Sequence, residues 1–295
     1  MSEQAIVLNQ LTKHYGTHRG INDLSFSVNE GEFFGFIGPN GAGKSTTIRT
    51  LMGLIHPSGG NASIFGLDCQ TKASVIARDV GYLPSENSYY ENMKVRELLQ
   101  YTADLYAMNC ETKMYELSER LNLDLSRKIA DLSLGNKKKV GIVSAIMTSP
   151  KLLIMDEPTS GLDPLMQKEF FTLLKERHKT GATIFLSSHI LSEIQRNCNR
   201  AAIIREGQII ACNRVENLTQ TNTKHVTVHG ITSLPDIPNI RNLQTISDGF
   251  SFLFQGEISV LLQILSRINL TDVNIADPDL EEIFLHYYAK GGNLS

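Results

Sequence analysis

The chain has no tryptophan, only four cysteines and no long apolar run, and each absence weakens one class of protein. Without tryptophan, a function built on indole stacking or on an interfacial membrane belt loses support. The cysteines, at positions 69, 110, 198 and 212, are scattered and form no C-x-x-C pair. We therefore expect free thiols rather than a disulfide scaffold or a metal site. No apolar stretch approaches the ~20 residues of a membrane-spanning helix.

An excess of basic charge is also missing. The chain has 28 Lys and Arg against 31 Asp and Glu, a formal net charge of −3. Proteins that coat nucleic acid usually carry a basic excess, so we expect no nucleic-acid partner. The first ten residues lack the basic-then-apolar pattern of a signal peptide, which predicts a cytoplasmic chain. With 295 residues, 41% of them hydrophobic, the chain can form one large domain and one smaller domain.

Apolar patterns along the chain predict an α/β fold. Residues 32–37 form a short, two-sided apolar run typical of a buried parallel strand, and a glycine-rich loop follows at 38–43. From Lys44 the apolar period becomes helical, with one face at Ile48, Leu51, Met52 and Ile55. Two more buried-strand patterns, at 152–155 and 183–186, are each followed by a helical pattern. This alternation indicates an α/β fold with a largely parallel sheet.

Two further regions differ from this α/β pattern. Helical patterns at 95–108 and 113–123, with no strand between them, predict a helical insert over about residues 85–149. After Arg214, short strands alternate with helices in what we expect to be a small α+β domain, with a ferredoxin-like arrangement as one candidate. We thus predict a large domain at 1–214 and a small one at 215–295. The expected elements of the small domain are strands at 226–228, 252–254 and 273–275 and helices at 258–268 and 280–288.

The loop after the first buried strand matches the phosphate-binding pattern G-x-x-x-x-G-K-[ST]. Its glycines let backbone N–H groups point at phosphate oxygens, and the following helix directs its positive end at the same anion. Lys44 would reach the terminal phosphates as a mobile charge, and the Ser45 hydroxyl is a ligand type that Mg²⁺ prefers. A chance glycine-rich turn is the alternative, which the flanking strand and helix disfavour. The matching residues are Gly38, Pro39, Asn40, Gly41, Ala42, Gly43, Lys44 and Ser45.

A carboxylate pair ends the second buried strand. Asp156 would hold Mg²⁺, directly or through water, and Glu157 could act as general base for the attacking water. A surface acidic pair at a strand end is the alternative interpretation. A GTPase would need an Asn-Lys-x-Asp motif, which residues 136–139 (NKKK) do not supply. Leu132–Asn136 (LSLGN) could bind a second phosphate through Ser133 and a helix start, or be an ordinary helix cap.

In this order, the segments resemble the nucleotide-binding subunit of an ATP-binding cassette (ABC) transporter over roughly residues 5–214, which implies a P-loop NTPase fold of the ABC type with a mixed sheet. Tyr15 looks like the ring that stacks on adenine, and His189 like the switch histidine that acts beside the catalytic Glu157. The resemblance implies that ATP binds to Walker A, to Ser133 and Gly135 of the signature, and to Asp163. The remaining matches are Gly38–Thr46 with Walker A, Leu132–Asn136 with the LSGGQ signature, Leu153–Asp156 with Walker B and Ser160–Asp163 with the D-loop.

Two departures from the family pattern affect the expected site. Where the family places a glutamine after Gly-Tyr-Leu-Pro, this chain has Ser85, with Glu86 next. Serine is too short to replace glutamine, so Glu86 or a water molecule would have to substitute. Leu134 and Asn136 replace a glycine and the glutamine of the signature. This variant of the signature resembles the one found in exporters of drugs, peptides and bacteriocins. Residues 277–284 (DPDLEEIF) resemble the helix that often ends exporter cassettes, although a capped amphipathic helix would look alike.

The resemblance implies an ATP-hydrolysing subunit of an exporter, with ATP and Mg²⁺ as cofactors. It also implies a second cassette, identical or paralogous, separate transmembrane permease subunits, and a peripheral position on the cytoplasmic face of the membrane. Three alternatives stay open. They are a soluble cassette ATPase of translation or DNA repair, an uptake ATPase, and an inactive regulatory cassette. The presence of Lys44, Asp156, Glu157 and His189 argues against the last one.

Overall fold

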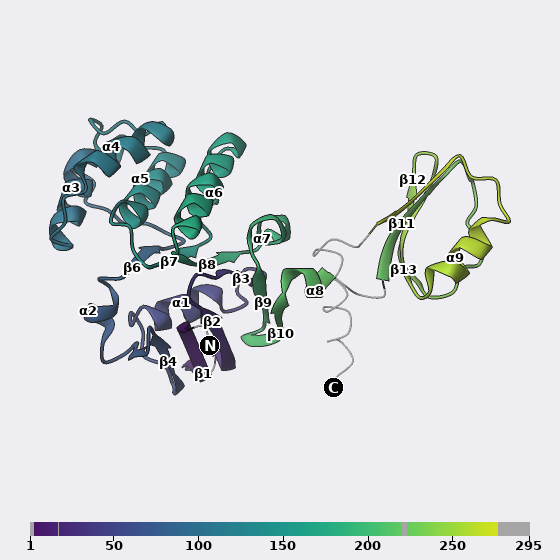
Figure 1. Cartoon of the computed structure of the whole chain (residues 1–295), viewed down its shortest axis with the longest axis horizontal. Coiled ribbons are helices and arrows are strands. Elements are labelled where there is room, and N and C mark those ends of the chain that lie inside the picture. Colours follow the sequence, from purple (N-terminus) through teal and green to yellow (C-terminus); the bar gives the residue numbers. More distant parts are fainter. Residues whose placement is uncertain (1–2, 17, 220–222, 277–295) are drawn as a thin grey trace. The chain divides into compact units, whose positions relative to one another are not determined.

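The chain forms two compact units, Met1–Cys212 and Asn213–Ser295. The computed structural model (Figure 1) describes residues 3–16, 18–219 and 223–276. Among these residues, no helix has the length and apolar character needed to cross a membrane.

A six-stranded sheet is the centre of the first unit. Its five strands from β9 to β6 run parallel. All residues of β3, β7 and β8 are buried, which explains their two-sided apolar runs and confirms the three strands predicted from the sequence. The strand order is β10 (Gln208–Arg214), β9 (Arg200–Arg205), β3 (Phe33–Ile37), β8 (Thr183–Ser188), β7 (Leu152–Asp156) and β6 (Val80–Leu83).

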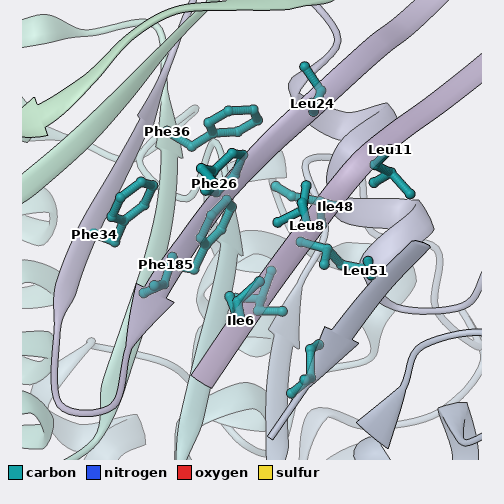
Figure 2. Packing of buried hydrophobic residues seen from close by; sticks show 14 of the residues in the cluster. Ile6, Leu8, Leu11, Leu24, Phe26, Phe34, Phe36, Ile48, Leu51 and Phe185 are labelled. Atoms are coloured by element: carbon teal, nitrogen blue, oxygen red, sulfur yellow. The ribbon is translucent and has the colours of Figure 1, made fainter. Parts of the chain in front are cut away.

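An antiparallel sheet, which the sequence did not predict, packs against α1 (Lys44–Leu51) and the central sheet. It has the order β2 (His18–Asn29), β1 (Gln4–Tyr15), β4 (Gly59–Ile64) and β5 (Leu67–Asp68). Figure 2 shows the shared core, where Phe26 of β2 stacks on Phe34 and Phe185 with ring centroids 5.6 and 6.4 Å apart. Ile48 and Leu51 of α1 join the same cluster. This packing fixes the helix that follows the phosphate-binding loop.

The helical insert contains both predicted helices, although each ends before its predicted last residue and the second begins two residues earlier than predicted. They are α3 (Val95–Leu105) and α4 (Glu111–Arg120), followed by η1 (Ile129–Asp131) and α5 (Leu134–Met147). Left-handed backbone at Ala107 and Asn122 lies just past α3 and α4, so neither helix reaches its predicted end. In the same way α1 stops before the left-handed Gly53, and Ile55 lies beyond the helix on which we expected it.

Helices α2 (Ala73–Ile76), α6 (Pro164–Lys179) and α7 (Leu191–Asn197) complete the first unit. Arg120, at the end of α4, ties the insert to α6. Its Nε lies 2.6 Å from Glu169, and its two terminal nitrogens donate to both carboxylate oxygens of Glu176. Such a bidentate pair defines one geometry between two helices.

The second unit begins with α8 (Val215–Thr219) and contains an antiparallel sheet of order β12-β13-β11-β14. Strands β11 (Thr223–His229), β13 (Gly249–Gln255) and β14 (Asp272–Ala276) contain the three predicted strands, and α9 (Ile258–Leu265) lies within the predicted helix. Strand β12 (Ile240–Ile246) was missed because it is largely exposed and carries no apolar alternation.

The connectivity of the second unit is similar to the ferredoxin-like arrangement considered from the sequence. Strands β13 and β14 lie on either side of β11 and are joined through α9, which makes a split βαβ unit. Residues 230–239 connect β11 to β12 without a helix. The helix predicted at 280–288, and with it the exporter-like segment 277–284, lies outside the described residues.

Candidate nucleotide-binding and hydrolysis site

The loop between β3 and α1 has the backbone shape expected for phosphate binding. Gly41 and Gly43 have φ angles of 80° and 110°, which side-chain-bearing residues rarely adopt. Gly43 occupies the N-cap of α1 and no side chain caps that helix, so its first amide groups remain available for an anion. Ala42 is buried, and its carbonyl accepts the amide of Gly207 2.9 Å away, which anchors the loop to the sheet.

This loop forms one wall of a cavity of about 390 Å³. The cavity brings together most of the predicted nucleotide-binding residues, although they come from four separate stretches of the sequence. The lining residues are Tyr15, Gly20, Pro39, Asn40, Gly41, Gly43, Lys44, Ser45, Thr46, Ser85 and Glu157.

Tyr15 lies at the end of β1 with 44% of its surface exposed, so its ring can accept a stacked base. The ammonium of Lys13 is 5.3 Å from the ring centroid, an added positive charge beside the ring face. Gly20, on the paired strand β2, was not predicted as a site residue. A Cβ there would lie 3.1 Å from a Tyr15 ring carbon and 2.7 Å from the Lys13 carbonyl oxygen. A glycine inside a strand is the signal that could have indicated this close approach.

The carboxylate of Glu157 lies between the side chains of Lys44 and His189. Lys44 Nζ lies 3.0 Å from one carboxylate oxygen, and His189 Nδ1 lies 2.7 Å from the other. Lys44 Nζ also donates to the carbonyl oxygens of Gly38 and Pro39, at 2.6 and 3.1 Å. Three groups predicted separately from the sequence therefore meet, with the Glu157 side chain only 13% exposed and His189 46% exposed.

Asp156 is fully buried beneath this group at the carboxyl end of β7. One carboxylate oxygen accepts the Ser187 hydroxyl at 2.6 Å, and the same hydroxyl oxygen accepts the Glu157 amide at 3.2 Å. Glu157 itself has a left-handed backbone, with φ of 48°. Ser187 thus fixes the two acids relative to each other. Ser187 was not predicted as a site residue from the sequence.

Glu193, which sequence reasoning missed, supports the turn that carries His189. Ser188 donates its hydroxyl to Glu193 at 2.7 Å, and the Ser188 carbonyl accepts the amide of Gly38 at 3.4 Å. Burial raises the pKa of the Glu193 carboxyl, while hydrogen bonds from Ser188 and Thr159 act in the opposite direction. The His189 turn is therefore linked to the phosphate-binding loop and to the segment after Glu157.

Comparisons with known proteins agree with this geometry. The model of the ABC transporter family matches residues 21–160. The bacitracin transport ATP-binding protein BcrA of Bacillus licheniformis is 32% identical, and the match covers 97% of this chain and 98% of that protein. The linearmycin resistance ATP-binding protein LnrL of Bacillus subtilis is 30% identical, with 94% and 96% covered. A solved ATP-binding subunit of an ABC transporter is 33% identical with a TM-score of 0.69, covering 73% of this chain and 92% of that one.

The chain belongs to the ABC transporter ATP-binding family. The predicted fold, a P-loop NTPase of the ABC type, is confirmed by the similarity to solved cassettes. The protein is thus an ATP-binding subunit and an ATPase, as the sequence analysis concluded.

The signature segment of this ABC subunit is placed apart from the ATP cavity. Ser133 is the N-cap of α5 and accepts the Asn136 amide at 3.3 Å, which is the ordinary cap that the sequence left open. Asp163 caps α6 in the same way, by accepting the Met166 amide at 3.0 Å. Of the residues described here, Ser133, Gly135 and Asp163 are not among those that line the cavity.

The signature and the D-loop touch each other within this chain. A Cβ at Gly135 would lie 2.6 Å from the carbonyl oxygen of Gly161, so only glycine fits without a shift. Leu134, which replaces a signature glycine, is 75% exposed. Its side chain cannot fill a hole in this chain, and it leaves Gly135 free to make its close contact.

The segment with the missing glutamine reaches the cavity through Ser85, which is among the lining residues. Glu86 is exposed and is not among them, so the expectation that it substitutes for glutamine gains no support. The carbonyl oxygens of Pro84 and Ser85 accept hydrogen bonds from Lys138 Nζ, at 3.2 and 2.9 Å.

Proposed function

We propose that this ABC ATPase powers the export of a drug, peptide or similar compound through separate permease subunits at the cytoplasmic face of the membrane. The relatives BcrA and LnrL carry names for bacitracin transport and linearmycin resistance, and both match nearly the whole chain. The observation that carries the ATPase mechanism is the position of Glu157, which lines the cavity and contacts both Lys44 and His189.

Nucleotide binding uses the loop and the exposed tyrosine. The amide groups of the loop and of the first turn of α1 bind phosphate oxygens, and Lys44 exchanges its contact with Glu157 for the terminal phosphates. Tyr15 stacks on the base without contacting its edge, so the site distinguishes ATP from GTP only weakly. That all these groups line one cavity supports this assignment.

Ser45 and Asp156 are the residues that would hold Mg²⁺. The donor set fits the metal, because a hydroxyl and a carboxylate are hard oxygen ligands. Asp156 is buried and hydrogen-bonded to Ser187, so its carboxylate is oriented in a fixed direction. When bound, Mg²⁺ supplies charge neutralisation of the phosphate oxygens.

Hydrolysis requires a base for the attacking water. Glu157 accepts the proton of that water, and His189 orients the Glu157 carboxylate through its 2.7 Å contact. Lys44 stabilises negative charge on the transferred phosphoryl group. The left-handed backbone at Glu157, together with Ser187, directs the side chain into the cavity.

Two cassettes are needed to complete the site. Ser133 and Gly135 lie outside this chain's own cavity, which supports their use at the cavity of a second cassette facing head to tail. Exposed Leu134 and Leu165, at 75% and 70%, lie at the starts of α5 and α6 and can add apolar contacts there. ATP shared by both faces closes the pair, and its hydrolysis reopens it.

The proposal is tested by purifying the tagged full-length chain from its native cells in mild detergent. Association with a polytopic membrane protein is expected. With ATP present, the Glu157→Gln variant should recover more of this membrane protein than wild type does. Introducing Lys44→Ala should reduce that increase in recovery. If the chain is recovered only with ribosomes or DNA, the soluble alternative replaces the export proposal. Transport direction is then measured in vesicles, where uptake of substrate into inside-out vesicles indicates export.

A further inference from the structure

Lys138 is a buried lysine outside the nucleotide-binding motifs. It lies in the second turn of α5, with 3% of its surface exposed. Burying an ammonium is costly unless hydrogen bonds and charges compensate, so a lysine at this position needs a specific partner set. The partners are the carbonyl oxygens of Pro84 and Ser85, which belong to the segment that lines the ATP cavity.

The same segment packs on α5 at a second point, one turn further along the helix. A Cβ at Gly141 would lie 2.6 Å from the Tyr89 hydroxyl and 3.2 Å from Asn87 Oδ1. Residues 84–89 therefore lie along one face of α5, and Lys138 is the charged contact in this packing. Asp156 and Glu157 stabilise its positive charge electrostatically, while burial lowers its pKa.

We propose that Lys138 is a positioning residue that ties Ser85, and with it the ATP cavity, to the signature helix α5. Helix α5 begins at the Ser133 cap, and its rigid first turns connect that cap to Lys138. Serine is short, so its distance to the nucleotide depends on where its backbone is held. The lysine fixes that backbone from behind by two carbonyl hydrogen bonds. This inference rests on the proposed function, because it assumes that ATP occupies the cavity.

The test compares Lys138→Met with Lys137→Met in the full-length chain. Methionine keeps the length of the apolar stem and removes the donors. Lys137, the adjacent lysine, lies 3.5 Å from the exposed Glu91 and is a matched control. Hydrogen exchange with and without ATP is measured by mass spectrometry on peptides covering residues 38–46 and 80–92. Steady-state ATPase activity is measured in parallel.

In wild type and Lys137→Met, ATP should slow exchange in both peptides. In Lys138→Met, ATP should still protect residues 38–46 from exchange but no longer protect residues 80–92. The kcat for ATP hydrolysis should fall about tenfold or more, while KM should change less than threefold. Lys138→Gln, which keeps a donor, should retain part of the protection, and it replaces the methionine variant if that one does not fold. A purely structural lysine would alter both peptides together.

Wild-type kcat and wild-type protection at 80–92 in Lys138→Met would overturn the proposal. So would an effect confined to KM. Failure of the proposed function gives a different pattern, because wild type itself would then show no ATP-dependent protection and Glu157→Gln would leave hydrolysis unchanged.

Discussion

The ammonium of Lys44 and the carboxylate of Glu157 are 3.0 Å apart, although 112 residues lie between them in the sequence. The phosphate-binding lysine and the proposed base are thus paired with each other. Both groups line the cavity, and in the proposed mechanism Lys44 leaves Glu157 for the terminal phosphates. We therefore expect ATP binding to release the proposed base.

The first prediction concerns Glu157→Gln, which should separate ATP binding from hydrolysis. Glutamine keeps the size of the side chain but cannot accept the water's proton. Loss of a general base typically costs 10²–10⁴-fold, about 3–5 kcal/mol of barrier, so kcat should fall by that factor. ATP should still bind and should hold two cassettes together, seen by size-exclusion chromatography with ATP at low Mg²⁺.

Lys44→Ala is the matched control for this experiment. It removes the other half of the pair and should abolish the ATP-dependent dimer, because the phosphate contact is lost. Hydrolysis by Glu157→Gln at the wild-type rate would mean that Glu157 is not the base. The next candidate base would then be His189, which contacts Glu157.

A second prediction concerns Tyr15, whose exposed ring borders the cavity. Base–aromatic stacking is worth about 1–3 kcal/mol in nucleic-acid sites, so Tyr15→Ala should weaken ATP binding about ten- to hundredfold. Tyr15→Phe keeps the ring and should bind almost normally. Fluorescence titration with a labelled ATP analogue measures both. An alanine variant with wild-type affinity would remove Tyr15 from the site.

The two segments proposed to bind phosphate and Mg²⁺ could be located from the sequence because each one is continuous and follows a buried strand. Residues 38–46 and 156–157 sit at the ends of strands with unmistakable apolar runs, and parallel strands bring their carboxyl ends to one edge. The strand assignments for β3, β7 and β8 followed from the same runs.

Contacts made by side chains at long range could not be predicted in this way. Gly20 borders the Tyr15 ring only because β2 pairs with β1 in this register. The register of the hairpin cannot be read from the sequence pattern. Ser187 and Glu193 act through hydrogen bonds across β7, β8 and α7. Strand β12 was missed since its exposed face carries no alternation that distinguishes it from a loop.

A third prediction addresses the small C-terminal unit. A chain shortened to end at Arg214 retains β10 and all the cavity residues, so it should bind ATP within about threefold of the full-length affinity. Circular dichroism establishes that the shortened chain is folded, and titration gives its affinity. A folded chain that cannot bind ATP would mean that the C-terminal residues belong to the nucleotide-binding domain.

A fourth prediction uses the buried carboxyl of Glu193, whose pKa is raised mainly by desolvation. Its folded pKa lies above its unfolded value, so the native state binds this proton more tightly than the unfolded chain does. The stability that the carboxyl contributes is complete below the unfolded pKa of about 4.5 and is lost as the pH rises through the folded pKa. Glutamine cannot ionise, yet its amide oxygen can still accept the Ser188 hydroxyl.

Glu193→Gln should therefore become more stable relative to wild type as the pH is raised from about 4.5 to about 8. The quantity compared is the free energy of unfolding of the variant minus that of wild type. Urea titrations at several pH values measure this difference. Glu116→Gln, at an exposed position of α4, is measured in the same way as the control substitution. Parallel curves for Glu193→Gln and wild type would mean that this carboxyl is not destabilised by burial. ATPase activity is measured alongside, and a lower kcat together with the expected pH-dependent gain would indicate that the Glu193 carboxylate also holds Ser188 and the His189 turn in place for hydrolysis.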